Sequence, residues 1–278
     1  MKAINKVREV TGILREYGIE GARKEAEILI AYGAGIEALE MYRDNPDMTD
    51  SQIYAAEKLL SRRLLREPLS YIIGHEEFMD LTLEVGDGVL IPRPETELMA
   101  EHALKKRGAH TILDLCTGSG CLALALAMGI PSSQVYGVDI SDVAIGYAKR
   151  NALRNNISNV TFLHGDLFEP FKDKKFFDLI ISNPPYIRSG DIIGLQPEIR
   201  EWESKTALDG GEDGLDFYRR IILSASGYLK DRGRLMLEIG AGQSDDTAEM
   251  IRSAGYSCFR IIKDYNGIER IVEAEWRN

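Results

Sequence analysis

The sequence is poor in cysteine and has no long apolar stretch, and both absences narrow the classes of protein it can belong to. The 278 residues include three cysteines, Cys116, Cys121 and Cys258, which form no CxxC pair and no metal-type cluster. We expect buried thiols in a cytoplasmic protein, because that compartment keeps thiols reduced. No run of 18 apolar residues is present, and residues 1–15 carry four basic side chains without an apolar core. Neither a membrane span nor a signal peptide is therefore predicted.

Basic side chains are also scarce. The formal net charge is −10, and residues 1–75, with 11 basic and 12 acidic side chains, contribute almost none of it. Proteins that bind nucleic acid through its phosphates need a basic surface. The charge therefore disfavours nucleic acid as a partner, whereas an acidic protein body tolerates a basic protein partner.

The first 70 residues have helical periodicity. Apolar residues recur at helical spacing over residues 4–17, and a second helix is predicted over about residues 21–32. A third helix begins near Thr49, where Thr49 and Gln52 have capping-box spacing, and stops before Pro68. Its outer face is expected to be either a solvated surface or a docking surface for an anionic partner, and it carries Arg62, Arg63 and Arg66.

Residues 71–91 lose this periodicity. Apolar and polar residues alternate on both sides of Gly86-Asp87-Gly88, which is typical of a β-hairpin with its turn at the glycines. We predict that this hairpin connects a helical domain, residues 1–70, to a second domain, residues 92–278. A helix reaching about Arg107 should follow the "PRPETE" segment.

From His110 onwards, strands alternate with helices. Seven strand-like segments occur, most of them alternating with helical ones, and the last two strands are close in sequence with no helix between them. Such alternation predicts an α/β fold with a mostly parallel, Rossmann-like sheet covered by helices on both faces. The last strand should pair antiparallel.

A glycine-containing loop, "DLCTGSG" at residues 114–120, joins the first of these strands to its helix. Glycines there let a ligand approach the backbone at a helix N-terminus. The segment has neither the G-x-G-x-x-G spacing of dinucleotide sites nor the Lys-Ser or Lys-Thr of a phosphate loop. Asp139 ends the next strand, where it can accept hydrogen bonds from ribose hydroxyls. Asp166 and Leu167 follow the third strand, at the expected adenine position. S-adenosylmethionine fits these features better than NAD.

The segment "DLIISNPPYIRSGD", residues 178–191, ends a buried strand with an Asn, two prolines and a Tyr. Prolines stiffen the chain and restrict the residue before each of them. The side-chain carbonyl of Asn183 and the backbone carbonyl of Pro184 can each accept one N–H bond of a planar amide or aromatic amine. The delocalised nitrogen would then point its lone pair at a methyl sulfonium, with Pro185 adding rigidity and Tyr186 an apolar wall. Catalysis of this kind depends on orientation and fixed dipoles rather than on a general base.

The whole chain resembles the HemK/PrmC family of class I S-adenosylmethionine-dependent methyltransferases, which methylate the glutamine side-chain amide of peptide chain release factors. The resemblance rests on "EPLSYIIGHEEF" (67–78), "LIPRPETE" (90–97), "DLCTGSG", "VDIS" (138–141), "FDLIISNPPYI" (177–187), "ALDGGEDGLDFYRRI" (207–221) and "LEIGAGQ" (237–243). It implies a helical domain that recognises the substrate, transfer to N5 of the glutamine in a Gly-Gly-Gln motif, and S-adenosylhomocysteine as the product. We expect a monomer without a metal.

The resemblance also implies site residues. The glutamine amide would lie at Asn183, Pro184, Pro185 and Tyr186. The methyl donor would contact Arg93, Thr96, Cys116, Thr117, Gly118, Ser119, Gly120, Asp139, Asp166, Leu167 and Asn183. Cys116 stands where the family usually has glycine. Glu238, which ends the fifth strand, either contacts the pocket or is a solvated strand terminus.

Three other functions remain open on the sequence. A glutamine of a ribosomal protein would suit the same chemistry. So would an exocyclic amine of DNA or RNA, although the negative charge and the lack of a basic, aromatic-rich module count against it. The third is an adenosine-binding module without activity, which the intact Asn-Pro-Pro-Tyr sequence disfavours.

Overall fold

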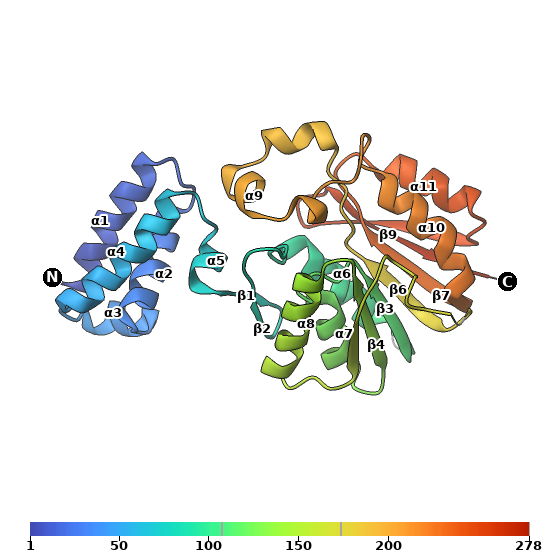
Figure 1. Cartoon of the computed structure of the whole chain (residues 1–278), viewed down its shortest axis with the longest axis horizontal. Coiled ribbons are helices and arrows are strands. Elements are labelled where there is room, and N and C mark those ends of the chain that lie inside the picture. Colours follow the sequence, from blue (N-terminus) through green and yellow to red (C-terminus); the bar gives the residue numbers. More distant parts are fainter. Residues whose placement is uncertain (107, 173, 278) are drawn as a thin grey trace. The chain divides into compact units, whose positions relative to one another are not determined.

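The chain folds into two units in the computed structural model, which describes residues 1–106, 108–172 and 174–277 (Figure 1). Unit 1 consists of Met1–Gly74 together with Pro197–Trp202, and unit 2 consists of His75–Gln196 and Glu203–Asn278. A short helix inserted in the second half of the chain therefore belongs to the N-terminal unit.

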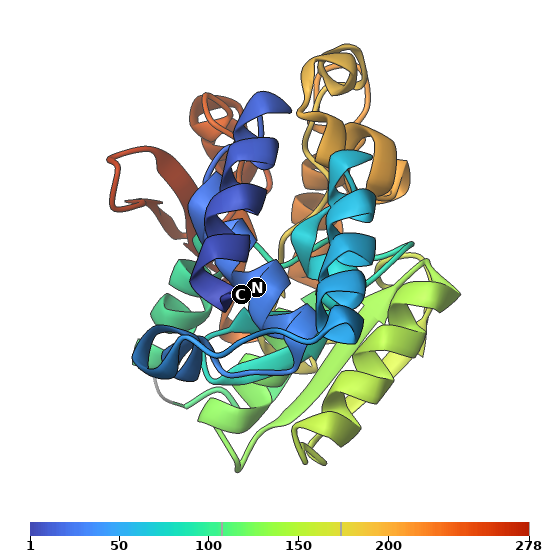
Figure 2. The same ribbon diagram turned by 90° about the vertical axis from the view of Figure 1, so that its left-hand side faces the viewer.

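Unit 1 is helical. Helix α2 packs against both α1 and α4, as Figures 1 and 2 show, and its Leu29 and Ile30 are fully buried beside Leu14 and Met41. The helices are α1 (Ala3–Glu16), α2 (Ala22–Ala34), α3 (Ala38–Asp44), α4 (Asp50–Leu64), α5 (Leu69–Ile73) and α9 (Pro197–Trp202). The sequence predicted α1, α2 and α4. It missed α3, a helix of seven residues that buries one side chain, Met41, and therefore has no apolar periodicity to detect.

The start of α4 confirms the predicted capping box. The Thr49 side chain accepts from the backbone N–H of Gln52 at 3.3 Å, and the Gln52 side chain accepts from the backbone N–H of Thr49 at 2.9 Å. Two of the helix's unpaired amide groups are satisfied in this way.

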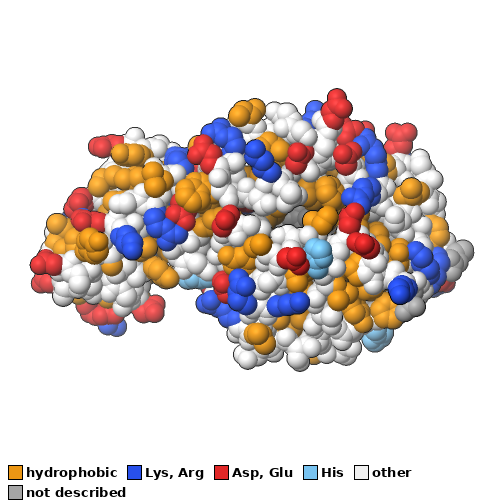
Figure 3. All heavy atoms as spheres, in the orientation of Figure 1, with side chains coloured by type: hydrophobic (Ala, Val, Ile, Leu, Met, Phe, Trp, Pro, Cys, Tyr) orange, Lys and Arg blue, Asp and Glu red, His pale blue; other side chains and the backbone are white. Residues whose placement is uncertain are grey.

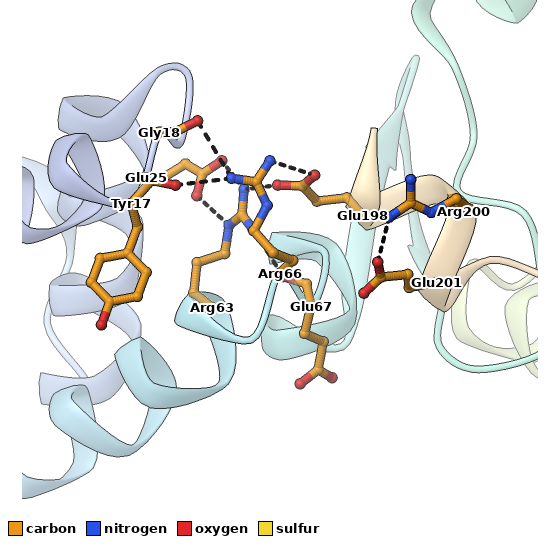
Figure 4. A network of polar contacts seen from close by, with 9 residues as sticks. All are labelled: Tyr17, Gly18, Glu25, Arg63, Arg66, Glu67, Glu198, Arg200 and Glu201. Atoms are coloured by element: carbon orange, nitrogen blue, oxygen red, sulfur yellow. Dashed lines mark hydrogen bonds and ion pairs between the residues drawn. The ribbon is translucent and has the colours of Figure 1, made fainter. Parts of the chain in front are cut away.

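The end of α4 differs from the prediction of an outward-facing arginine surface. Arg63 is 4% exposed and binds Glu25 of α2 at 2.6 Å and Glu198 of α9 at 2.9 Å. Arg66 binds the other oxygen of Glu198, also at 2.9 Å (Figure 4). The charge of Arg63 is therefore compensated by two carboxylates inside unit 1 and not by solvent. The Arg63–Glu198 pair attaches α9 to the N-terminal helices.

The predicted hairpin exists, but its turn was misplaced. Strands β1 (His75–Phe78) and β2 (Leu81–Glu84) pair antiparallel and turn at residues 79 and 80, not at Gly86–Gly88. The side chains of Asn151 in α8 (Asp142–Arg154) and of Asn155, which directly follows this helix, accept from the backbone N–H groups of Glu84 and Thr82, at 2.6 and 3.2 Å. The hairpin is thus fixed to unit 2. Gly88, one of the two glycines that suggested a turn, instead lines a cavity.

Unit 2 is built on a sheet of seven strands in the order β5-β4-β3-β6-β7-β9-β8. Strands β3 to β7 pair parallel, and β9 pairs antiparallel with both β7 and β8, which confirms the predicted fold class. The strands are β3 (Thr111–Leu115), β4 (Gln134–Asp139), β5 (Val160–His164), β6 (Phe177–Ser182), β7 (Leu229–Glu238), β8 (Cys258–Lys263) and β9 (Glu269–Glu275).

Helices cover both faces of this sheet (Figure 1). Successive strand residues point to opposite faces, so Ile112 packs in one apolar cluster and Leu113 in the other. The first cluster holds side chains of α6 (Pro94–Lys105), α7 (Cys121–Gly129) and α8 (Asp142–Arg154); the second holds those of α10 (Asp216–Tyr228) and α11 (Ser244–Ser253). Helix α6 ends at Lys105, and the end predicted near Arg107 lies outside the described residues.

The structure tests what the composition predicted about membrane spans and cysteine burial, and it shows how surface charge is distributed. Acidic and basic side chains are interspersed on the face that Figure 3 shows. Among the described residues, no helix has both the length and the apolarity needed to cross a lipid bilayer. All three cysteines are free; Cys116 and Cys121 are partly buried and Cys258 is exposed, so the prediction of buried thiols is wrong for Cys258. Cys258 begins an edge strand, where one side is not covered by another strand.

Candidate active site

The carboxyl ends of β3, β4, β5 and β6 surround a cavity in unit 2, at the edge where parallel α/β sheets bind ligands. Most of the predicted site residues line it: Arg93, Thr96, Cys116, Thr117, Gly118, Ser119, Asp139, Asp166, Leu167, Asn183 and Pro185. Gly120, Pro184 and Tyr186 are not among the lining residues. Gly120 lies behind the loop, where an added Cβ would come within 3.0 Å of the Phe162 ring.

Asp114, which the sequence reading did not select, organises the loop after β3. Its Oδ2 accepts from the Thr117 hydroxyl at 2.5 Å and from the backbone N–H of Ala123 at 3.2 Å. Its Oδ1 is buried without a hydrogen-bond partner in the described protein. Burial raises the pKa of Asp114 to about 7. The backbone of this loop turns sharply at Cys116, which adopts a φ of 56°. This is the left-handed region, which the glycine usual in the HemK/PrmC family would adopt more readily than cysteine.

Asp139 joins this loop to the end of β4. One of its oxygens accepts from the backbone N–H of Gly118 at 2.8 Å, and the other accepts from that of Ser141 at 2.9 Å. Burial raises the pKa of Asp139 against the opposing effect of these amides. Each carboxylate oxygen retains a second acceptor site that a ligand hydroxyl can use.

Helix α10 contributes two lining residues that the sequence reading missed, Phe217 and Arg220. Arg220 binds Asp166 at 2.6 Å, and Leu167 beside it is 7% exposed. On the side of the "PRPETE" segment, Arg93 binds the buried Glu203 at 2.6 Å. Both arginines that line the cavity are thus paired with carboxylates.

The Asn-Pro-Pro-Tyr segment is fixed from several directions. The backbone carbonyl of Tyr186 accepts from Gln243 Nε2 at 3.0 Å. Ile187 exchanges backbone hydrogen bonds with Leu208 and Gly210, at 3.0 and 2.8 Å. A Cβ on Gly210 would lie 2.7 Å from the Tyr186 Cα, so only glycine allows this approach. The loop at residues 208–210 therefore packs directly on the Asn-Pro-Pro-Tyr segment.

Asn183 lines the cavity and bonds to residues behind it. Its Nδ2 donates to the Thr96 hydroxyl at 3.1 Å, and that hydroxyl donates to Glu238 Oε2 at 2.7 Å. The hydroxyl of Tyr186 donates to Glu238 Oε1 at 3.4 Å. Glu238 is 1% exposed, which excludes the solvated strand terminus that the sequence left open. Burial raises its pKa to about 7.

The cavity can accept a ligand with cationic and hydroxyl donors. It presents carboxylates from Asp114, Asp139 and Asp166 and an unpartnered buried oxygen on Asp114. A diphosphate would meet these carboxylates without a free arginine to balance it, since Arg93 and Arg220 are paired. In the described residues, no three His, Cys, Asp or Glu side chains are grouped to hold a metal ion.

Two family profiles match the chain. The methyltransferase small domain matches residues 94–195, and the PrmC N-terminal domain matches residues 6–74. The release factor glutamine methyltransferase of Thermodesulfovibrio yellowstonii is 43% identical over 98% of this chain and 97% of that protein. Its counterpart from Geobacter sulfurreducens is 46% identical over 97% and 95%.

Solved structures agree at the level of the fold. A methyltransferase from Pyrococcus furiosus superimposes with a TM-score of 0.55 and 20% identity, over 72% of this chain and 91% of that one.

Proposed function

The chain belongs to the family of release factor glutamine methyltransferases, and from that premise we propose that it transfers a methyl group from S-adenosylmethionine to N5 of the glutamine in the Gly-Gly-Gln motif of a peptide chain release factor. The observation that carries the proposal is that Asn183 lines a carboxylate-containing cavity with its amide nitrogen bonded to Thr96. A release factor as substrate would place the reaction in the cytoplasm, where translation occurs.

Asn183 and Pro184 would orient the glutamine. With Asn183 Nδ2 bonded to Thr96, its Oδ1 lies on the opposite side of the amide and is available to accept one N–H of the substrate. The backbone carbonyl of Pro184 would accept the other N–H. Gln243 and Gly210 hold Tyr186, two residues after Pro184, so the two acceptors need not reorganise during the reaction. The methylated nitrogen then releases its extra proton to water.

The cavity suits S-adenosylmethionine, which supplies an electrophilic methyl group on a sulfonium. The free Oδ1 of Asp114 would accept from the ammonium group of its methionine portion. Asp139 would accept from the ribose hydroxyls through its remaining acceptor sites, and Leu167 would contact the adenine. The N-terminal end of α7, where Ser119, Cys121 and Leu122 line the cavity, would face the carboxylate end through the positive end of the helix dipole.

The reaction is tested by methyl transfer from labelled S-adenosylmethionine to a purified bacterial release factor. The matched control is the same release factor with its Gly-Gly-Gln glutamine changed to alanine. Duplex DNA, ribosomal RNA and ribosomal proteins serve as parallel substrates. We expect label on the wild-type release factor alone. Label on nucleic acid or on a ribosomal protein, with none on the release factor, would assign one of the other substrates.

We also propose that unit 1 recognises the protein substrate and that the enzyme acts as a monomer. Removal of residues 1–70 should lower the affinity for the release factor and leave a cofactor-binding unit 2. In that shortened chain, Glu198 should be changed to Gln, because its partners Arg63 and Arg66 are gone. Calorimetric titration with S-adenosylhomocysteine and KM for the release factor measure the two properties separately. An unchanged KM would contradict this role for unit 1.

A further inference from the structure

Behind Asn183 lies a buried chain of hydrogen bonds whose donor-to-acceptor direction is fixed while Glu238 is ionised. Thr96 and Glu238 are each 1% exposed, so water does not compete for their polar atoms. An ionised carboxylate only accepts hydrogen bonds, and a threonine hydroxyl has one proton to donate. At 2.7 Å from Glu238, the Thr96 proton is committed to the carboxylate. The hydroxyl oxygen therefore has only acceptor capacity left for Asn183.

This direction fixes which end of the Asn183 amide faces the cavity. The amide can rotate by half a turn, which exchanges its carbonyl oxygen and its NH₂ group at nearly equal shape. Only the NH₂ group can donate to Thr96, as it does at 3.1 Å. The flipped amide would place two oxygens without a proton between them, and a buried unpaired acceptor costs about 1–3 kcal/mol. Oδ1 is thus held on the side where a substrate N–H arrives.

We propose that Thr96 and Glu238 are positioning residues for the methyl transfer: together they set the orientation of the Asn183 amide so that its carbonyl, not its NH₂ group, faces the substrate nitrogen. This inference rests on the proposed function. It assigns Thr96 a role other than holding the methyl donor, because the Thr96 hydroxyl is hydrogen-bonded to both Asn183 and Glu238. The effect on catalysis passes through Asn183.

A proton on Glu238 would remove the direction. A protonated carboxyl can donate, so the Thr96 proton becomes free to turn toward Asn183 and to stabilise the flipped amide. Burial raises the pKa of Glu238 to about 7, with Glu95 adding to the rise and Arg270 and the hydrogen bonds from Thr96 and Tyr186 opposing it. Activity should therefore fall as the pH drops below about 7.

The first test is Thr96→Val, which keeps the shape and removes the hydroxyl. We expect kcat to fall roughly 100-fold, the scale of misplacing a catalytic group. KM for S-adenosylmethionine should change less than threefold. Thr96→Ser retains the hydroxyl and should restore kcat to within about threefold of the wild type. The control Ser133→Ala removes another buried hydroxyl, which donates to the Ile130 carbonyl, and should leave kcat unchanged.

The second test is the pH profile of kcat in Glu238→Gln. An amide cannot gain a proton in this range, so the decrease in kcat between pH 8 and 6 should disappear. Asp114, whose pKa is also about 7, is intact in this variant. A decrease that persists would therefore belong to another group and would overturn the role of Glu238. This profile also decides the matter if Thr96→Val does not fold.

The outcomes separate this inference from the proposed function. A wild-type enzyme that methylates the release factor, together with Thr96→Val at full kcat, would reject the positioning role alone. A wild-type enzyme without transfer to the release factor would reject the proposed function.

Discussion

Unit 1 and the cavity of unit 2 treat buried charge in opposite ways. In unit 1, Arg63 and Lys6 are 4% and 3% exposed, and each binds two carboxylates. At the cavity, Asp114 and Glu238 are each 1% exposed, and hydroxyls and a backbone N–H are their hydrogen-bond donors. No described Lys, Arg or His forms an ion pair with either carboxylate.

The difference shows what each kind of burial is suited for. A buried charge with opposite charges beside it stays ionised, and its loss leaves the partners uncompensated. A buried carboxylate without a cation changes its protonation near neutral pH and lowers stability when it is ionised. Ion pairs in unit 1 therefore hold its helices together. The carboxylates at the cavity lack a neighbouring cation, so they are suited to bind a cationic ligand or to fix the position of a hydrogen-bond proton.

The largest expected effect concerns Asn183, whose amide is oriented by the buried carboxylate of Glu238 through Thr96. Asn183→Ala should lower kcat by roughly 10³-fold, because it removes the oriented carbonyl. Binding of S-adenosylhomocysteine, measured by calorimetry, should stay within a fewfold. The control is Asn159→Ala, whose amide donates to the carbonyls of Ala127 and Ser133 away from the cavity. Near-normal turnover of Asn183→Ala would refute the orientation mechanism.

The second effect concerns the buried pair in unit 1. Arg63→Met leaves Glu25 and Glu198 without their shared cation, so unit 1 should lose about 3–5 kcal/mol of unfolding free energy. The chain has two tryptophans, and Trp202 lies in α9. In a Trp276→Phe background, its fluorescence during urea unfolding reports on unit 1. A loss below about 1 kcal/mol would show that the network is not structural.

The third effect concerns the pH dependence of the unfolding free energy, which should have opposite signs in the two units. The folded pKa of Glu238, about 7, exceeds its ordinary value of 4.5, so the native state binds more protons between those values. The stability of unit 2 should fall as the pH rises through this window, by at most about 1.4 kcal/mol per pH unit. Glu238→Gln should reduce this slope, measured by the fluorescence of Trp276 in a Trp202→Phe background. An unchanged slope would show that Glu238 does not titrate in this window.

Glu198 should behave in the reverse manner. Burial acts to raise its pKa, but hydrogen bonds from its own backbone amide and from Arg63 and Arg66 outweigh burial and lower the pKa below 4.5. Its contribution is therefore present above pH 4.5 and lost as the pH falls through the folded pKa. Glu198→Gln should lower the stability of unit 1 at pH 7 and weaken its acid sensitivity. Equal acid sensitivity in both proteins would contradict this account.

The smallest effect comes from an exposed pair in unit 1. Lys2 and Asp47 bind at 3.0 Å, but their side chains are 48% and 72% exposed. Lys2→Met should change the unfolding free energy of unit 1 by less than about 1 kcal/mol, since water screens such pairs. The same Trp202 fluorescence measures it. A loss as large as that of Arg63→Met would mean that pairing, rather than burial, decides the energetics.

The sequence was sufficient for features encoded by neighbouring residues. The capping box at Thr49, the strand–helix alternation and the Asn-Pro-Pro-Tyr segment are all local patterns, and the structure contains each of them. The Thr96–Glu238 bond joins residues 142 positions apart and left no local pattern. The burial of Arg63 was missed for a related reason, since its partner Glu198 comes from the far half of the chain.

The assignment of α9 to unit 1 has a consequence for how the protein is made. Domains generally fold as units while the chain leaves the ribosome, N-terminal part first. Glu198 emerges only after β3, β4, β5 and β6 of unit 2 have been synthesised. Until then, Arg63 and Arg66 lack this carboxylate. The first unit to be translated is therefore completed only after much of the second has been synthesised.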